Sequence, residues 1–354
     1  MKVLVVGGAG YIGSHMVKML SQQDHQVITL DNLSNGHRDS VRYGEFVQGD
    51  ISNTVLLDRL FTENRFDGVM HFASFIEVGE SVRKPAKYFC NNFSNTLNLL
   101  DAMVRHKVNQ FIFSSTAAIF GEPETLPIDE KHPKQPINPY GRSKLMVEQA
   151  LEDYDRAYGL KSVCLRYFNA AGADPDGELG ERHEPETHLI PLILQAASGR
   201  RDEISVFGQD YDTPDGSCLR DYIHIVDLCT AHLLALENLI EGSGSKQYNL
   251  GNGGGFSVLE VIELTKKITG RDFRVIHADR RPGDPAVLVA DSTLAKSELE
   301  WKPEFNDLAA IIKHAWQWEI SHFVGRSEQS FPLHADASPL WMRPLQESIK
   351  VMSH

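Results

Sequence analysis

The sequence predicts an α/β protein whose first half forms a doubly wound parallel sheet and whose second half adds a smaller mixed α/β lobe. Short apolar runs such as VLVV alternate with segments of helical period, which is the pattern of βαβ units. These runs are nearly continuous in β-branched residues, as expected of strands covered on both faces. A glycine-rich turn directly after the first run supports the same architecture.

The elements follow one another with short connections. The apolar runs predict strands at Lys2–Val6, Gln26–Leu30, Glu45–Gln48, Gly68–Phe72, Gln110–Ser114 and Lys161–Arg166. Helical periodicity between them predicts helices near Gly10–Ser21, Thr54–Phe61, Val82–His106 and Tyr140–Ala157.

The regular alternation ends after Phe168, where a long loop rich in glycine, proline and charge begins. The chain is therefore divided into a nucleotide-binding domain (1–168), a substrate-binding domain (169–324) and a tail without periodicity (325–354). Within the second domain, the segment RDYIHIVDLCTAHLLALENL predicts a strand and an amphipathic helix at 220–239, which we expect to pack back on the first domain.

Composition narrows the class of protein. The chain has 354 residues, of which 42% are hydrophobic, and its 35 basic against 48 acidic residues give a net charge of -13. This balance argues against a nucleic-acid surface, and no apolar run is long enough for a membrane span or a signal peptide. The 4 cysteines are scattered without a C-x-x-C pair, so neither a disulfide framework nor a metal site is expected, and the predicted location is cytoplasmic.

The segment VVGGAGYIG places Gly7, Gly10 and Gly13 between the first strand and the first helix. The first glycine permits a tight turn, the second lets a pyrophosphate approach the backbone, and the third permits close helix–sheet packing. Glycines also serve ordinary turns, but the strand before and the helix after give this motif the context of a Rossmann-type dinucleotide site.

Two aspartates extend this prediction. Asp31 ends the second strand, at the spacing where a carboxylate accepts hydrogen bonds from the ribose hydroxyls. A 2′-phosphate would be repelled there, so NAD is favoured over NADP. Asp50 follows the third strand, where an adenine contact is plausible. The alternative reading makes both residues turn or cap residues.

A second cluster combines Tyr140, Lys144 and Thr116. Tyr140 and Lys144 stand at i and i+4, so both project from one face of a helix. A lysine ammonium and an oxidised nicotinamide would together lower the pKa of the phenol and make it a base. Thr116 leaves the carboxyl end of the fifth strand and can hydrogen-bond the same substrate oxygen. The alternative is an ordinary helix start with a solvated lysine.

A series of motifs then carries a resemblance over roughly residues 1–318: GGAGYIG, DNLSNG, GDI, HFASFIEVGESV, FIFSST, PYGRSKLMVE, LRYFNAAGA, RDYIH and RRPGDPA. Together they resemble the extended short-chain dehydrogenase/reductases, and among these the UDP-glucose 4-epimerases. The resemblance implies reversible epimerisation at C4 of UDP-glucose and UDP-galactose in galactose metabolism, through a 4-keto sugar and enzyme-bound NADH. It also implies a homodimer paired through helices equivalent to Asn92–His106 and Arg142–Tyr158.

The resemblance also implies roles for individual residues. Tyr140 would exchange the proton of the sugar 4-hydroxyl, Thr116 would hold the same oxygen, and Lys144 would contact the nicotinamide ribose. Cofactor contacts would comprise Gly7, Gly10, Tyr11, Ile12, Gly13, Asp31, Asn32, Asn35, Gly36, Asp50, Ile51, Phe72, Ala73, Ser74, Asn91, Ser114, Tyr140, Lys144 and Phe168. Substrate contacts would comprise Thr116, Asn169, His188, Leu189, Val206, Phe207, Arg220, Arg281 and Asp284.

Some positions depart from the family or separate rival functions. Ile76 replaces a lysine that some members carry near the cofactor, and Leu288 lies where the family admits or excludes N-acetylated sugars, which leaves that specificity open. Sugar 4,6-dehydratases need an acid and a base directly after the catalytic threonine, whereas this chain has Ala117 and Ala118. Epimerases or decarboxylases of UDP-uronates, and a protein that binds NAD without turnover, remain alternatives.

Overall fold

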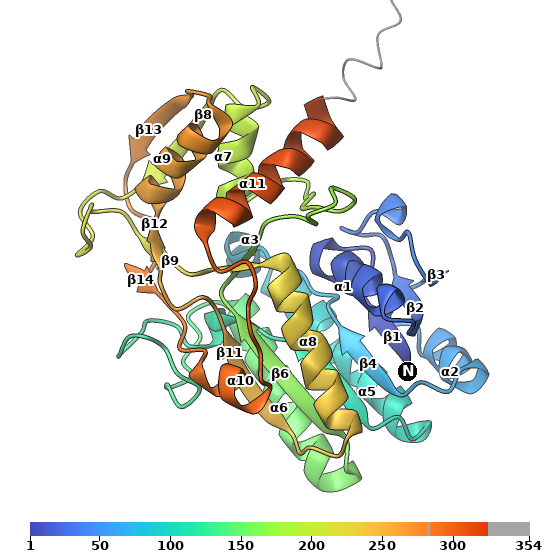
Figure 1. Ribbon diagram of the computed structural model, residues 1–354. Coiled ribbons are helices and arrows are strands. Elements are labelled where there is room, and N and C mark those ends of the chain that lie inside the picture. Colours follow the sequence, from blue (N-terminus) through green and yellow to red (C-terminus); the bar gives the residue numbers. More distant parts are fainter. Residues whose placement is uncertain (282–283, 325–354) are drawn as a thin grey trace, which may run out of the picture.

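The computed structural model describes residues 1–281 and 284–324, and its centre is a seven-stranded parallel sheet (Figure 1). The strand order is β11-β6-β5-β4-β1-β2-β3. Val5 of β1, for example, pairs with Thr29 of β2 on one side and Met70 of β4 on the other. The strands are β1 (Lys2–Val6), β2 (Gln26–Asp31), β3 (Glu45–Gln48), β4 (Gly68–His71), β5 (Gln110–Ser114), β6 (Lys161–Tyr167) and β11 (Lys246–Leu250).

Helices cover both faces of this sheet, because alternate residues of its strands point to opposite sides. Val3 and Val5 of β1 pack in one core with α1 (Tyr11–Gln22) and α8 (Ile225–Ile240). Leu4 and Val6 pack in the other with α2 (Thr54–Glu63), α5 (Asn95–Arg105) and α6 (Pro139–Tyr158). The predicted doubly wound α/β sheet is thus confirmed.

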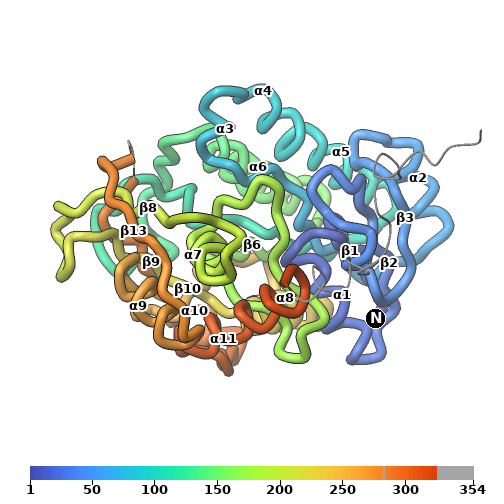
Figure 2. The backbone as a smooth tube through the Cα atoms, turned by 90° about the horizontal axis from the view of Figure 1, so that it is seen from above, coloured from blue at the N-terminus to red at the C-terminus, as the bar shows by residue number. Residues whose placement is uncertain are grey.

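A smaller lobe lies beyond the carboxyl ends of the strands (Figures 1 and 2). Its core lies between the helices α7 (Leu189–Ala197), α9 (Val258–Thr269) and α11 (Leu308–Glu319) and the parallel pair β8 (Glu203–Phe207) and β13 (Arg274–Ala278). Its other strands are β7 (Asn169–Ala171), β9 (Leu219–Arg220), β10 (Tyr222–His224), β12 (Phe256–Ser257) and β14 (Val287–Leu288). Short helical elements complete the chain: η1 (Arg38–Ser40), η3 (Ala117–Ile119), α10 (Thr293–Glu298) and η4 (Ile320–Val324).

The long helix predicted near Val82–His106 is wrong at its start, because the helical backbone is interrupted at Lys84 and then runs from Pro85 to Arg105. The structure has α3 (Val78–Arg83), α4 (Pro85–Tyr88) and the π-helical η2 (Phe89–Ser94) before α5. Pro85 disfavours helical backbone at Lys84, which has φ -131, and then starts a new helix itself. The other predicted strands and helices lie within a few residues of the observed ones.

Two segments from beyond residue 168 join the large sheet. Helix α8 packs on β5 and β6, as the sequence predicts for 220–239. Strand β11 pairs in parallel with β6, an addition that the sequence pattern did not single out. The predicted tail, 325–354, lies outside the described residues, and the division at residue 168 stays a prediction.

Within residues 1–281 and 284–324, no helix is both long and apolar enough to cross a bilayer. The cysteines are free thiols, three of them buried, and Cys90 is exposed.

Candidate active site

The turn after β1 is built so that only glycine fits at two positions. Gly7 has φ +82, and a Cβ there would lie 2.5 Å from the backbone nitrogen of Ala73. A Cβ on Gly13 would lie 2.2 Å from the carbonyl oxygen of Gly7. At Gly10 the nearest atom would be 3.4 Å away, so the protein itself leaves space there. Gly7 and Gly13 are therefore required by the protein's own packing, whereas the open space at Gly10 would let a ligand approach the backbone.

Helix α1 begins directly after this turn. Its N-cap is Gly10, and no side chain caps its first amides. The positive end of the helix dipole and these amides therefore suit a pyrophosphate. A dinucleotide fits the residues present on this side of the sheet.

The acidic residues at the ends of β2 and β3 make contacts with nearby backbone and side chains, and their role toward a dinucleotide stays a prediction. Asp31 is buried and accepts hydrogen bonds from the amides of Ala9 (2.9 Å) and Leu33 (2.8 Å). Burial raises the pKa of this carboxyl group, and the two amides act against that rise. Asn32 donates to Asp50 at 2.5 Å, so these two side chains are brought together at the adjoining edge.

A cavity of about 340 Å³ opens between the glycine turn and the carboxyl ends of β4, β5 and β6. It brings together residues predicted for the cofactor with the predicted catalytic pair Tyr140 and Thr116. Its predicted lining residues are Gly7, Gly10, Tyr11, Ile12, Asn35, Phe72, Ser74, Thr116, Tyr140, Phe168, Asn169 and His188. Ala117, Ala118, Ile76 and Leu288 also line it.

Tyr140 and Thr116 both line this cavity, and the Thr116 hydroxyl lies near enough to the phenol to act on its pKa. Asn138 caps α6 by accepting from the amide of Gly141 (2.9 Å), and Pro139 occupies the first turn, which sets Tyr140 at the start of the helix. Burial raises the pKa of Tyr140, whereas its hydrogen bond with Thr116 lowers it. Thr116 also accepts from the amide of Ala118 at 3.1 Å, which orients its hydroxyl.

Lys144 lies one turn further along α6 and is buried. Its Nζ donates to Ser74 Oγ (2.6 Å) and to the carbonyl of Ser114 (2.9 Å). Burial lowers the pKa of Lys144 to about 7, with the charge of Glu148 acting against that change. The alternative of a solvated lysine is therefore wrong.

The predicted lowering of the Tyr140 pKa depends on Lys144 together with an oxidised nicotinamide, and the residues of the protein do not produce it by themselves. The pKa of Tyr140 is raised, because desolvation outweighs the hydrogen bond from Thr116. Lys144 is itself a weakened source of positive charge, since its own pKa is lowered to about 7. The residues alone therefore do not supply a phenolate, and a further positive charge beside the ring is required for one.

Several positioning contacts were not predicted from the sequence. Tyr167, next to the predicted Phe168, hydrogen-bonds Ser114 Oγ at 2.6 Å and lines the cavity. Asn92, next to the predicted Asn91, is buried and bonds the backbone of Phe75 and the hydroxyl of Ser143. Asn91 itself donates to Asn92 (2.9 Å).

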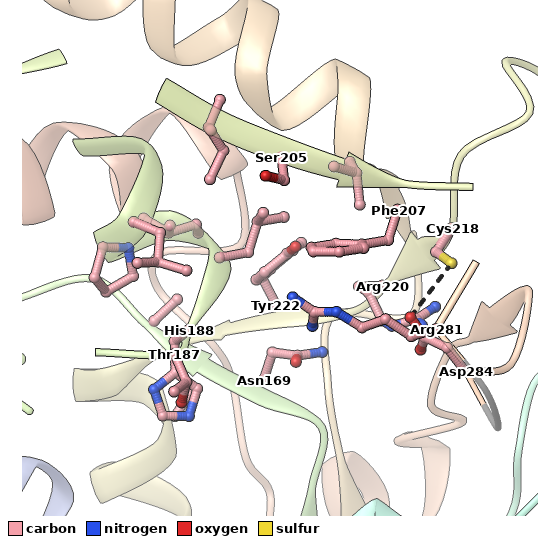
Figure 3. A pocket seen from close by; sticks show the side chains of 18 of the residues that line it. Asn169, Thr187, His188, Ser205, Phe207, Cys218, Arg220, Tyr222, Arg281 and Asp284 are labelled. Atoms are coloured by element: carbon pink, nitrogen blue, oxygen red, sulfur yellow. Dashed lines mark hydrogen bonds and ion pairs between the residues drawn. The ribbon is translucent and has the colours of Figure 1, made fainter. Parts of the chain in front are cut away.

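A second cavity of about 280 Å³ adjoins the first, because Asn169, Ala170 and His188 line both. Figure 3 shows this second cavity, with Asn169 and His188 among its lining side chains. It brings together the predicted residues Leu189, Phe207, Arg220, Arg281 and Asp284. The guanidinium of Arg281 stacks on the ring of Phe207, 3.8 Å from its centroid, and Arg220 pairs with Asp284. Two arginines beside an aromatic ring suit phosphate groups attached to a planar base.

Some predicted residues contact neither cavity directly. Val206 is buried in the core of the smaller lobe, on the other side of β8 from Phe207. Ile51 packs in the core of the large sheet. Gly36 lies against Ala9, where a Cβ would come within 2.8 Å.

The long loop between β7 and α7 supplies residues that sequence reasoning missed. Glu181 and His183 line the first cavity beside His188. The loop is held in place by contacts from distant parts of the chain: Lys18 bonds Asp174 at 2.8 Å, and Arg182 pairs with Asp39. Only the run of acids and histidines in ELGERHEPETH could have drawn attention to these residues.

The fold and this pair of cavities define an enzyme class: a Rossmann-type protein that holds a dinucleotide beside a substrate hydroxyl. Residues 3–251 match the family described as the NAD dependent epimerase/dehydratase family. The chain belongs to this family.

Named relatives are similar over nearly the whole chain. A UDP-glucose 4-epimerase of Halalkalibacterium halodurans is 50% identical over 330 residues, which cover 93% of this chain and 99% of that protein. The crystal structure of UDP-glucose 4-epimerase from Brucella ovis in complex with NAD has a TM-score of 0.87 at 50% identity, covering 89% and 97% of the two chains. The enzyme from Bifidobacterium longum in complex with NAD+ and UDP has a TM-score of 0.86 at 40% identity, covering 91% and 99%.

Proposed function

We propose that this chain catalyses the reversible epimerisation of UDP-glucose and UDP-galactose at C4, with NAD as its cofactor. The observation that carries this proposal is the shared wall of the two cavities. Asn169, Ala170 and His188 join a cavity containing the glycine turn and Tyr140 to one containing Arg220 and Arg281. A nucleotide sugar bound across that wall would bring its hexose to Tyr140 and its diphosphate to the arginines.

On the cofactor side, the glycine turn and the first amides of α1 would hold the pyrophosphate, and Asp31 would accept from the adenosine ribose. Lys144, Ser74 and Tyr167 lie at the carboxyl end of the sheet, where they would position the nicotinamide half. Bound NAD supplies a reversible hydride acceptor and a positive charge, which is the charge that the Tyr140 phenol needs in order to ionise.

The phenolate of Tyr140 would take the proton of the sugar 4-hydroxyl as the C4 hydrogen leaves as hydride. Thr116 would donate to the same sugar oxygen and hold it during the transfer. Once the 4-keto sugar had turned within the cavity, its other face could take the hydride back, and Tyr140 would return the proton. Because hydride is returned, the cycle consumes no cofactor and requires NAD to stay bound.

The side chains around this centre disfavour the rival reactions. Ala117 and Ala118 line the cavity but carry no transferable proton, so elimination of water across C5 and C6 has no acid or base there. The histidines of the cavity, His183 and His188, are paired with Glu181, which leaves them poorly suited to a sugar C6 carboxylate. Leu288 lines the cavity, and acceptance of N-acetylated sugars is left to experiment.

A substrate panel tests the proposal. Purified protein is incubated with UDP-galactose, and UDP-glucose is detected with a coupled UDP-glucose dehydrogenase; we expect conversion. UDP-N-acetylgalactosamine and UDP-glucuronate are run beside it to define specificity. A protein that retains NAD yet converts none of these sugars would favour binding without turnover.

We further propose that the enzyme is a cytoplasmic homodimer paired through α5 and α6. Leu97, Val104 and Tyr154 lie half-buried on these two helices, and Tyr158 is exposed at the end of α6. Size-exclusion chromatography with light scattering measures the mass directly, and a monomer at micromolar concentration would contradict the dimer.

A further inference from the structure

Two glutamates and two histidines of the loop before α7 converge on one point. The ligating atoms of Glu181, His183, Glu186 and His188 all lie within 4.8 Å of one another. His188 Nδ1 is 2.7 Å from Glu181 Oε1 and 3.2 Å from Glu186 Oε1. His183 Nδ1 is 3.2 Å from Glu181 Oε1 and 3.6 Å from Glu186 Oε2. The four side chains therefore bring their ligating atoms into one small region.

Four ligands at about 2.0–2.2 Å from a zinc ion lie about 3.3–3.6 Å from one another. The separations of 3.2, 3.2 and 3.6 Å are close to such an edge, whereas the 2.7 Å between His188 Nδ1 and Glu181 Oε1 is shorter and would have to lengthen on metal binding. Two imidazoles and two carboxylates form a donor set that zinc accepts, and the two carboxylate charges balance a divalent cation.

The state of a ring nitrogen of His183 also supports a metal site. His183 Nδ1 is buried and makes no hydrogen bond in the described part of the chain, although two carboxylate oxygens lie near it. His183 Nδ1 is thus close to these oxygens without hydrogen-bonding them, which is the placement expected if a metal ion were bound by all three atoms. The carboxylate of Glu186 is in turn fixed by the amides of Thr187 (2.8 Å) and His188 (2.9 Å), as ligating carboxylates commonly are.

In the described part of the chain, no other cation pairs with these two acids. Across residues 1–281 and 284–324, the ion pairs of Glu181 and Glu186 run only to these two histidines. The neighbouring Arg182 points away and pairs with Asp39. The competing state is one in which both histidines are protonated: burial acts to lower the pKa of His183, but the two carboxylates raise it to about 9.

We propose that Glu181, His183, Glu186 and His188 bind one divalent transition metal ion, zinc in the first instance. All four positions are supplied by the protein, so the ion is structural rather than catalytic. It would fasten the loop between β7 and α7, which carries His188, the side chain shared by both cavities. The sequence-based expectation of no metal site considered the cysteines and overlooked this run of acids and histidines.

The test uses the full chain, stripped of metal with a chelator and titrated with Zn²⁺ against a chromophoric competitor. We expect one zinc ion per chain. Glu186→Gln should weaken binding at least about tenfold. Glu184→Gln, the same change at an exposed position two residues earlier, should bind as the wild type does. Co²⁺ in place of Zn²⁺ should give the visible absorption of a tetrahedral site in the wild type and in Glu184→Gln.

Thermal unfolding gives a second readout that does not depend on activity. Added zinc should raise the Tm of the wild type and of Glu184→Gln, and should leave that of Glu186→Gln unchanged. His183→Asn serves as the second variant if Glu186→Gln does not fold, as judged by circular dichroism. Equal zinc affinity in Glu186→Gln and Glu184→Gln, or no stoichiometric binding to the wild type at neutral and mildly alkaline pH, would overturn the proposal and leave a cluster of ion pairs.

Discussion

Replacing Tyr140 by phenylalanine removes one oxygen atom from the proposed reaction centre. Phenylalanine fills the same buried volume, and the neighbouring Thr116 hydroxyl keeps its contact with the amide of Ala118 at 3.1 Å. The free energy of unfolding should therefore change by no more than about 1 kcal/mol. A positioned general base contributes about 10²–10⁴-fold to rate, so the barrier should rise by about 2.7–5.5 kcal/mol.

The assay is conversion of UDP-galactose coupled to UDP-glucose dehydrogenase, with binding of UDP measured separately by calorimetry. Tyr248→Phe is the matched control, because Tyr248 is also buried and its hydroxyl bonds Glu298 (2.9 Å) away from both cavities. We expect the Tyr140 variant to lose turnover while keeping its affinity for UDP and its bound NAD.

The pH dependence sharpens this test. Burial raises the pKa of Tyr140, and the base is the ionised phenolate, so the rate should rise with pH until the phenol titrates. That rising limb should vanish in Tyr140→Phe. A variant with near wild-type turnover and the same pH profile would remove Tyr140 from the mechanism.

Three further substitutions test the cofactor and phosphate contacts. Gly10→Ala should leave stability nearly unchanged, because its Cβ meets nothing closer than 3.4 Å, but should weaken NAD retention after desalting, measured by the nucleotide released on denaturation. Lys144→Met should reduce both retained NAD and turnover, by about 10²-fold for the latter, since Ser74 and Ser114 lose their common donor. Arg220→Met should raise the KM for UDP-galactose about tenfold or more with a smaller effect on kcat, whereas Arg280→Met, which removes a pair with Asp210, should not.

Each of these has an outcome that would count against it. Full NAD retention in Gly10→Ala would mean that no phosphate approaches that glycine. Unaltered activity in Lys144→Met would mean that the lysine has only a structural role. Equal increases in KM for Arg220→Met and Arg280→Met would mean that the loss of one positive charge on the protein, and not a phosphate contact of Arg220, causes the change.

The large sheet was predictable because its signal is local. Each strand carries its own apolar run, and the turn at Gly7 contains its own steric requirement. The break in the helix at Lys84 follows from Pro85, a local signal that the predicted helix near Val82–His106 does not include. Strand β11 (KQYNL) carries a weaker pattern, because only its second half is buried.

The candidate site was predictable where side chains share one element, and not where distant segments meet. Tyr140 and Lys144 lie on one helix, so their spacing sufficed. Glu181 and His183 lie on a loop that is held by ion pairs with Lys18 and Asp39, which are more than 100 residues away in the sequence. Sequence spacing shows that Lys144 neighbours Tyr140, but not the burial that lowers the pKa of Lys144 and raises that of Tyr140.

Strand β11 is synthesised well after its partner strand β6, and this order matters while the chain is still on the ribosome. Its partner β6 ends at Tyr167, and β11 begins only at Lys246, so a growing chain presents an open sheet edge until the later segment is made. At about 5–20 residues per second this interval lasts on the order of 4–16 seconds. Val163 and Leu165 of β6 are buried in the finished protein, and an unpaired strand of this kind invites association between nascent chains. Ribosome-bound chains halted before Lys246 should accordingly recruit chaperones that chains halted after Leu250 release.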